Sequence, residues 1–134
     1  MVKDVKDGLS HTYMLGEKYI DRDLAKEGTS WGDDAGPFVS SDRNILRWAS
    51  YPRDATSTYY LDPQHDTRGN PLNPNDTAYG LTGMGTYNFG SAHSTGFNMS
   101  MCDGSIRLIN YNIAEQVHRS LCNRTDGATV EFPE

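Results

Sequence analysis

The pair Asp103-Gly104 lies between two segments of β-type sequence and constrains the fold more than any other feature. Residues 97–102 alternate apolar and polar side chains, and residues 106–111 are again rich in β-formers. Asp-Gly is a preferred pair for a two-residue type I′ turn, because both central positions of that turn need a positive φ. The pattern therefore predicts a β-hairpin with its turn at Asp103-Gly104.

A two-residue turn also predicts which side chains share a face of the hairpin. Cys102 would lie opposite Ser105, because these two residues flank the turn. One face would then carry Cys102, Arg107, Ile109 and Tyr111, and the other would carry Phe97, Met99, Met101, Ile106 and Leu108. We expect the second, more apolar face to pack against the rest of the domain.

The segment after the hairpin has the period of a helix. Asn110 or Asn112 can cap its start, and Gly127 lies past its end. Its apolar side chains recur at every fourth position, at Ile113, Val117 and Leu121. The predicted fold class is α+β: a small antiparallel β-sheet with a C-terminal helix packed on it and a loop-rich middle region.

Outside this unit the sequence predicts less regular structure. Residues 11–20 are apolar on both parities, which favours an inner strand of the sheet. Residues 29–83 are dominated by turn signals, with short apolar segments at 44–49 and 58–61. Residues 128–132 have β-character and predict a last edge strand. A connection as long as the middle region is a plausible place for a binding surface.

Length and charge limit the classes of function. A chain of 134 residues fits one domain spanning residues 1–134. The net charge is −6 and the 12 basic residues are scattered, which argues against nucleic acid as a partner. No apolar run is long enough to span a membrane, and residues 1–10 lack a signal-peptide apolar region. That absence fits a cytosolic protein or the exported part of a longer precursor.

His93 and Asp103 are the most tempting pair for catalysis. If residues 97–102 form a strand, its rise of roughly 3.3 Å per residue places the two ends ~20 Å apart. His93 would then lie near one end of the hairpin and Asp103 at the other. We therefore expect His93 to order the loop before the strand, and we predict no enzymatic activity.

The middle region offers oxygen ligands of the kind that calcium prefers. The candidate calcium ligands are Asp62, Asp66, Asn70 and Asp76. Their spacing does not match an EF-hand, and Asp and Asn are also ordinary turn residues, which is the simpler interpretation. No other cofactor is predicted, because no Cys or His pair has zinc-ligand spacing.

Cys102 and Cys122 leave the redox compartment open. The helix brings Cys122 back toward the tip of the hairpin, so the distance between the two cysteines would allow a disulfide. The predicted directions of the side chains argue against it, because Cys102 would point away from the helix and Cys122 lies off the apolar stripe of the helix.

Three sequons follow the Asn-X-Ser/Thr pattern, at Asn75, Asn98 and Asn123. They would be candidate glycosylation sites in a chain exported by a host that glycosylates. In an Asn-rich sequence they can also arise by chance.

His93 is followed by nine residues and then by Asp103-Gly104-Ser105. This spacing resembles the C-terminal H-x(9)-DG signature of a prepilin-like domain-of-unknown-function family of planctomycete bacteria. The segment from Gly8 through Gly16 and Glu17 is similar to its DG-S-NT…GE block, with His11 in place of the usual Asn. Further similar blocks are residues 89–93 (FGSAH), 103–111 and 123–130.

The resemblance implies the pilin-like globular domain of an extracellular or cell-surface protein, here without the N-terminal apolar helix that usually precedes it. On this basis we expect a structural subunit of a pilin-like filament whose partner is another copy of itself. Residues 128–132 could add as a strand to the next copy. Two alternatives stay open, a secreted module that binds a glycan or calcium and, more weakly, a hydrolase that uses His93.

Overall fold

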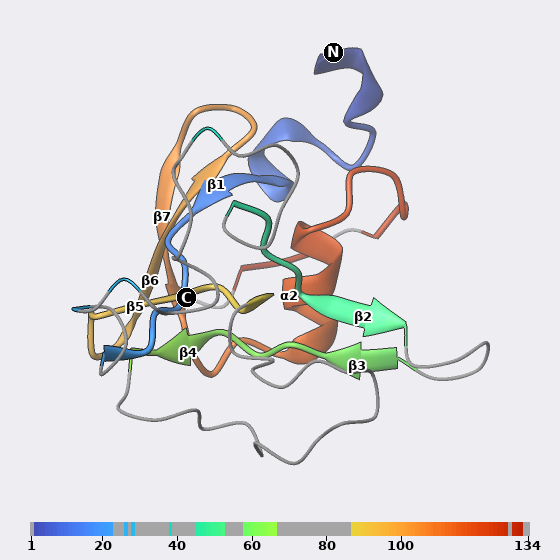
Figure 1. Cartoon of the computed structure of the whole chain (residues 1–134). Helices are drawn as coiled ribbons and strands as arrows, with labels where there is room; N and C mark the ends of the chain where they lie inside the picture. The colour runs from blue at the N-terminus through green and yellow to red at the C-terminus, as the bar shows by residue number, and fades with distance from the viewer. Residues whose placement is uncertain are drawn as a thin grey trace.

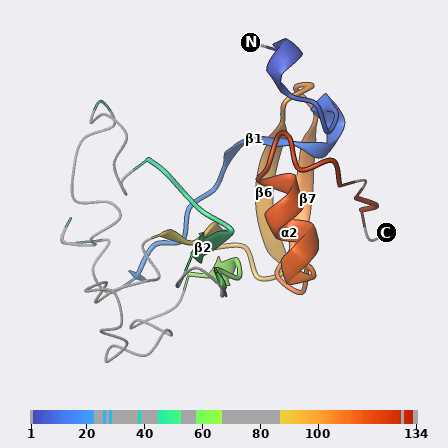
Figure 2. The ribbon, with the colours of Figure 1, turned by 90° about the vertical axis from the view of Figure 1, so that its right-hand side faces the viewer.

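The protein folds around a three-stranded sheet with a short helix on one face, as the computed structural model shows (Figures 1 and 2). The sheet consists of β1 (Tyr13–Gly16), β6 (Gly96–Met101) and β7 (Ile106–Asn110), and the helix is α2 (Glu115–Leu121). This confirms the predicted α+β class. The structure describes residues 2–22, 26, 28, 38, 45–52, 58–66, 87–128 and 130–132.

Smaller elements surround this sheet. Two 3₁₀ turns, η1 (Val2–Asp4) and η2 (Leu9–His11), precede β1. Two further pairs of short strands are present. β2 (Ser50–Pro52) pairs antiparallel with β3 (Thr58–Tyr60), and β4 (Gln64–His65) pairs parallel with β5 (Gly90–Ser91). Within the described part of the chain, no helix is long and apolar enough to span a membrane.

The strand order is β1-β6-β7, with both neighbouring pairs antiparallel. β1 is therefore an edge strand, and the inner position predicted for residues 11–20 is wrong. Its register with β6 shifts between Tyr13 and Leu15, which marks a β-bulge. Tyr13 and Tyr19 pack inward, whereas Met14 and Leu15 are 55% and 68% exposed. Apolar residues therefore occur at both odd and even positions of this segment because some of them are exposed, and not because both faces of the strand are buried.

The hairpin is present, but its turn is one residue longer than the sequence predicted. The Met101 N–H donates to the Ser105 carbonyl at 2.8 Å, and the Gly104 N–H donates to the Met101 carbonyl at 2.9 Å. Cys102, Asp103 and Gly104 therefore form a three-residue loop. Gly104 has φ +85°, and no non-glycine residue among the described ones has a positive φ. A type I′ turn needs positive φ at Asp103 too, so the chain adopts the type I turn followed by a glycine bulge.

That extra loop residue shifts the register and turns every β7 side chain to the other face. Phe97 pairs with Ile109, Met99 with Arg107, and Ser100 with Ile106. Ile109 is consequently buried in the core at 4% exposure, whereas Ile106 and Leu108 are 76% and 60% exposed. The predicted placement of Ile106 and Leu108 in the core was wrong.

The core lies between the inner face of the sheet and α2. It is formed by apolar residues from the hairpin, the helix and the segments around them: Phe89, Phe97, Met99, Met101, Ile109, Ile113, Leu121 and Val130. The predicted helical stripe is confirmed, with Ile113 and Leu121 buried and Val117 partly buried.

The helix starts later than predicted, because Ala114 is its N-cap and makes no side-chain capping bond. The Asn110 carboxamide instead accepts from the Asn112 N–H at 2.9 Å.

Both ends of the described chain are attached to the domain. The Asp7 carboxylate accepts hydrogen bonds from the Asp126 and Gly127 N–H groups, at 2.8 and 2.9 Å. Phe132 stacks on His11, with ring centroids 5.7 Å apart, and the Arg107 guanidinium lies 4.0 Å from the centre of the Phe132 ring. The predicted strand at 128–132 is absent from the residues described there; Val130 and Phe132 pack as irregular chain against the core.

One histidine is part of this core and was not predicted from the sequence. His118 on α2 is 1% exposed, and its ring lies 5.5 to 6.0 Å, between centroids, from the rings of Tyr13, Phe89 and Phe97. Its Nδ1 is 3.3 Å from the Tyr13 hydroxyl, and its Nε2 has no partner. Burial lowers the pKa of His118 to about 4 and raises the pKa of Tyr13.

The buried His118 should make stability depend on pH. In the unfolded chain it binds a proton near pH 6.5, whereas the folded protein excludes that proton until about pH 4. The unfolding free energy should therefore be complete above pH 6.5 and fall by about 3 kcal/mol as the pH drops toward 4. Urea denaturation of the wild type and of His118→Phe measures this. Equal pH slopes for the two proteins between pH 6.5 and 4 would contradict the assignment.

Candidate functional site

The face of the sheet opposite α2 exposes large apolar side chains. It is formed by alternate residues of the three strands, Leu15, Asn98, Ser100, Ile106, Leu108 and Asn110, which we call the outer sheet face. Leu15, Ile106 and Leu108 are exposed by 60% or more. None of the six side chains is ionisable, although the protein carries a net charge of −6.

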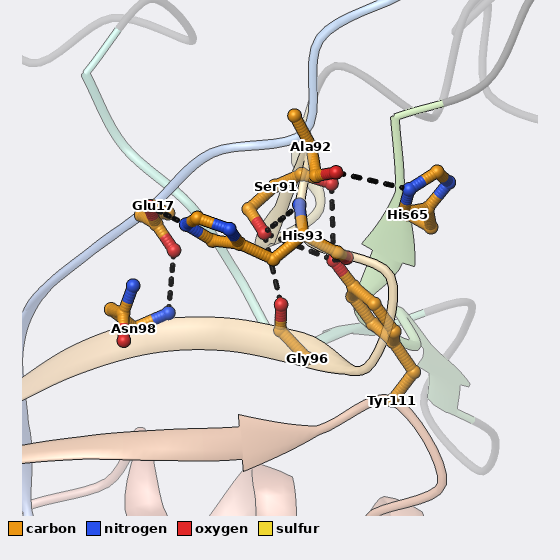
Figure 3. Close-up of polar contacts among 8 residues, drawn as sticks. All are labelled: Glu17, His65, Ser91, Ala92, His93, Gly96, Asn98 and Tyr111. Atoms are coloured by element: carbon orange, nitrogen blue, oxygen red, sulfur yellow. Dashed lines mark hydrogen bonds and ion pairs between the residues drawn. The ribbon is translucent and has the colours of Figure 1, made fainter.

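At the end of the sheet where β6 begins, the loop that contains His93 is held by several side chains (Figure 3). The hydroxyl of Tyr111, the residue after β7, lies 3.1 Å from the Ser91 carbonyl and 3.0 Å from the His93 carbonyl. The His65 Nε2 is 3.2 Å from the Ala92 carbonyl. The loop is thus tied to β7 and to β4, which lie far from it in sequence.

The polar groups of this loop form hydrogen bonds and close contacts with one another and with neighbouring residues. The Ser91 hydroxyl donates to the Gly96 carbonyl at 2.9 Å and accepts from the His93 N–H at 3.0 Å. The His93 Nε2 lies 3.4 Å from a Glu17 carboxylate oxygen, and the other oxygen of Glu17 accepts from the Asn98 N–H at 2.6 Å. The His93 side chain is 59% exposed. These contacts support the expected role of His93 in ordering the loop before β6.

Asp103 lies in the turn after β6, at the opposite end of the hairpin from His93, as the sequence predicted. Its carboxylate accepts from the Ser105 N–H at 2.8 Å and from the Ser105 hydroxyl at 2.6 Å. These hydrogen bonds lower the pKa of Asp103. Asp103, Gly104 and Ser105 therefore fix the conformation of the turn.

The remaining residues of the family blocks also have conformational roles. A Cβ on Gly16 would collide with the Met99 side chain and lie 3.1 Å from the Phe89 ring, so glycine allows β1 to approach the core. Gly8 precedes η2, and its carbonyl accepts from the Thr12 hydroxyl at 3.0 Å.

The candidate calcium ligands divide between described and masked parts of the chain. Asn70 and Asp76 lie outside the described residues. Asp66 faces the interior, where its carboxylate accepts from the Ile20 N–H at 2.9 Å and burial raises its pKa. Asp62 is exposed, and its backbone carbonyl accepts from the Asn88 carboxamide. No group of three or more metal-ligating side chains occurs among the residues that the structure describes.

Both cysteines are free thiols, and the disulfide considered between them is not formed. Cys102 lies in the turn of the hairpin, and its Sγ lies 3.6 Å from the Tyr13 carbonyl. Cys122 lines a polar pocket of about 310 Å³ near the end of α2, together with Arg47, Trp48 and Arg119.

Two of the three sequons fall on described residues. Asn123 is exposed, and its side chain accepts from the Thr125 N–H at 3.1 Å. Asn98 lies in the middle of the outer sheet face, on β6. Asn75 lies outside the described residues. A glycan on Asn98 would cover the outer sheet face.

Comparison with known proteins gives one family. The model of a family described as "Protein of unknown function (DUF1559)" matches residues 1–116. No curated protein and no solved structure matches the chain.

The Tyr111 hydroxyl should be the main attachment of the loop at 91–95. Tyr111→Phe removes its bonds to the Ser91 and His93 carbonyls and keeps the ring, so we expect a loss of about 1–2 kcal/mol of unfolding free energy. We also expect faster hydrogen exchange of amides 91–95. The control Glu17→Gln keeps an oxygen for the Asn98 N–H and changes only the exposed contact with His93, so the change should stay within about 1 kcal/mol. Unchanged exchange in Tyr111→Phe would show that the loop is held by other contacts.

Proposed function

Because the chain belongs to the DUF1559 family, a planctomycete-type prepilin-like domain of unknown function, we propose that it is a structural subunit of an extracellular pilin-like assembly. Its partner in this proposal is another copy of itself. The spacing of nine residues between His93 and Asp103-Gly104 supports the assignment of the H-x(9)-DG signature.

The outer sheet face is the observation that carries the proposal. A protein with a net charge of −6 repels its own copies over most of its surface. The outer sheet face carries no charge and exposes Leu15, Ile106 and Leu108, so burying it against a copy gains apolar contact without opposing charges. A contiguous exposed patch of this kind is typical of an interaction surface.

The contacts of the termini shift the proposed interface away from the ends of the chain. Assembly through residues 128–132 would require Val130 and Phe132 to leave their packing against the core. The hydrogen bonds from residues 126 and 127 to the Asp7 carboxylate would also restrict the movement of this segment. Breaking such contacts costs free energy before any new contact forms. The sheet face needs no rearrangement.

The family residues fit a structural role. His93, Glu17, Asp103 and Ser105 are engaged in loop and turn contacts, and the Ser91 hydroxyl is bonded to backbone groups. The proposal therefore gives none of them a catalytic step.

The polar pocket near the end of α2 favours a second candidate, a secreted glycan-binding module. Arg47 and Arg119 line one cavity together with Trp48. Such a set suits an acidic sugar and does not suit calcium, since like charges repel. A glycan-binding module would not need to associate with itself, which separates it from the first candidate.

Self-association of the purified chain tests the proposal. We expect sedimentation velocity to show a concentration-dependent increase in mass and electron microscopy to show regular assemblies. Ile106→Lys should weaken association by about tenfold or more, because a buried Ile side chain contributes about 1.5–3 kcal/mol. Asn112→Lys introduces the same charge at an exposed position off the outer sheet face and should leave association unchanged. A monomer at all accessible concentrations would refute the proposal.

A further inference from the structure

We propose that β7 is the pairing strand of this interface, and that it adds antiparallel to β7 of a second copy to form a continuous six-stranded sheet. The inference rests on the proposed function and specifies which edge the two copies share. It follows from the backbone geometry of the hairpin and from the side chains on both faces of β7.

The backbone groups of Ile106, Leu108 and Asn110 point away from β6. In an antiparallel ladder, hydrogen-bonded and non-hydrogen-bonded pairs alternate. The Met101–Ser105 pair is hydrogen-bonded, so the next hydrogen-bonded pairs are Met99–Arg107 and Phe97–Ile109. Residues 106, 108 and 110 belong to the intervening pairs. Their partners on β6 follow the same alternation, since the Asn98 carbonyl faces β1 and accepts from the Glu17 N–H at 3.1 Å.

The outer edge of β7 is available for pairing. β7 is the last strand of the sheet, and within the described chain no residue forms a backbone hydrogen bond with Ile106 or Leu108 on that side. The Asn110 carbonyl accepts from the Ile113 N–H at 3.1 Å, which ends the free edge there. Natural edge strands are usually protected by charge, proline or a covering segment. Here the side chains flanking the edge on the outer face are Ile106 and Leu108.

One register satisfies both the hydrogen bonds and the side chains. With Leu108 opposite Leu108 of the second copy, the two residues exchange both backbone bonds, and Ile106 lies opposite Asn110. The two Leu108 side chains then meet on the outer sheet face. On the inner face Arg107 lies opposite Ile109, so the two Arg107 side chains are not paired. A register centred on Arg107 would also align hydrogen-bonding groups, with Ile106 opposite Leu108, but it would place the two Arg107 side chains opposite each other, and like charges in that position are destabilising.

A second copy fits this edge because the contact is self-complementary. An antiparallel strand pair with identical partners has a two-fold axis, and each residue makes its contact twice. The absence of charge on the outer sheet face removes the repulsion that the net charge of −6 would otherwise impose. The contact closes on itself, so it defines a dimer, and a filament built from these dimers needs another surface as well.

Two substitutions at Leu108 test the pairing by different means. Leu108→Pro removes an N–H that points away from β6, so it should block pairing while keeping the hairpin, as proline does on natural edge strands. Leu108→Lys keeps the backbone and places two ammonium groups opposite each other across the axis. Leu46→Lys is the matched control, because Leu46 is an exposed leucine that lies outside the outer sheet face. Circular dichroism checks that each variant is folded.

We expect sedimentation velocity to show a wild-type dimer, at least about tenfold weaker association in both Leu108 variants, and wild-type association in Leu46→Lys. Association of Leu108→Pro and Leu108→Lys at the wild-type strength would overturn the pairing and leave the proposed function standing. Equal loss in all three variants would overturn it as well, because a lysine outside the outer sheet face would then weaken association as much as one at the β7 edge. A monomeric wild type would overturn both this inference and the proposed function.

Discussion

The register between β6 and β7 is the constraint on which the rest of the structure depends. It is set by the three residues of the turn, where Gly104 alone takes a positive φ and Asp103 holds Ser105 through its carboxylate. With this register Ile109 joins Phe97 in the core beneath α2, and Ile106 and Leu108 face outward. A slip by one residue would exchange these two sets, because strand side chains alternate between faces. The turn therefore determines both the core and the surface available to a partner.

The family residues support that arrangement from both ends of the hairpin. At one end Asp103-Gly104-Ser105 fixes the turn, and at the other Ser91, His93 and Tyr111 fix the loop that enters β6. Glu17, which follows β1, connects this loop to β6, because its carboxylate contacts the His93 ring and accepts from the Asn98 N–H. These residues hold a three-stranded sheet with one covered and one open face. The function that we propose belongs to the open face and to its β7 edge.

The sequence was sufficient where one local rule decided the outcome. Alternation predicted β6 and its buried Phe97, Met99 and Met101, the four-residue period predicted the buried side of α2, and strand length separated His93 from Asp103. The sequence was insufficient for the length of the hairpin turn, because Asp-Gly suits both a two-residue and a three-residue turn. His118 was missed because its burial comes from the rings of Tyr13, Phe89 and Phe97, which only the tertiary fold brings together. The contacts of Tyr111 with Ser91 and His93 likewise join segments with no shared pattern. Asn70, Asp76 and Asn75 fall outside the described residues, so their predicted roles stay predictions.

Nuclear Overhauser contacts between the two strands test the register most directly. In an antiparallel sheet, the α-protons of a non-hydrogen-bonded pair lie very close, since their Cα atoms are only about 4.5 Å apart. The account predicts strong α-proton contacts between Asn98 and Leu108 and between Ser100 and Ile106, which are paired residues of this type. A strong contact between Met99 and Leu108 in their place would show the two-residue turn. It would return Ile106 and Leu108 to the core and remove the basis for the proposed interface.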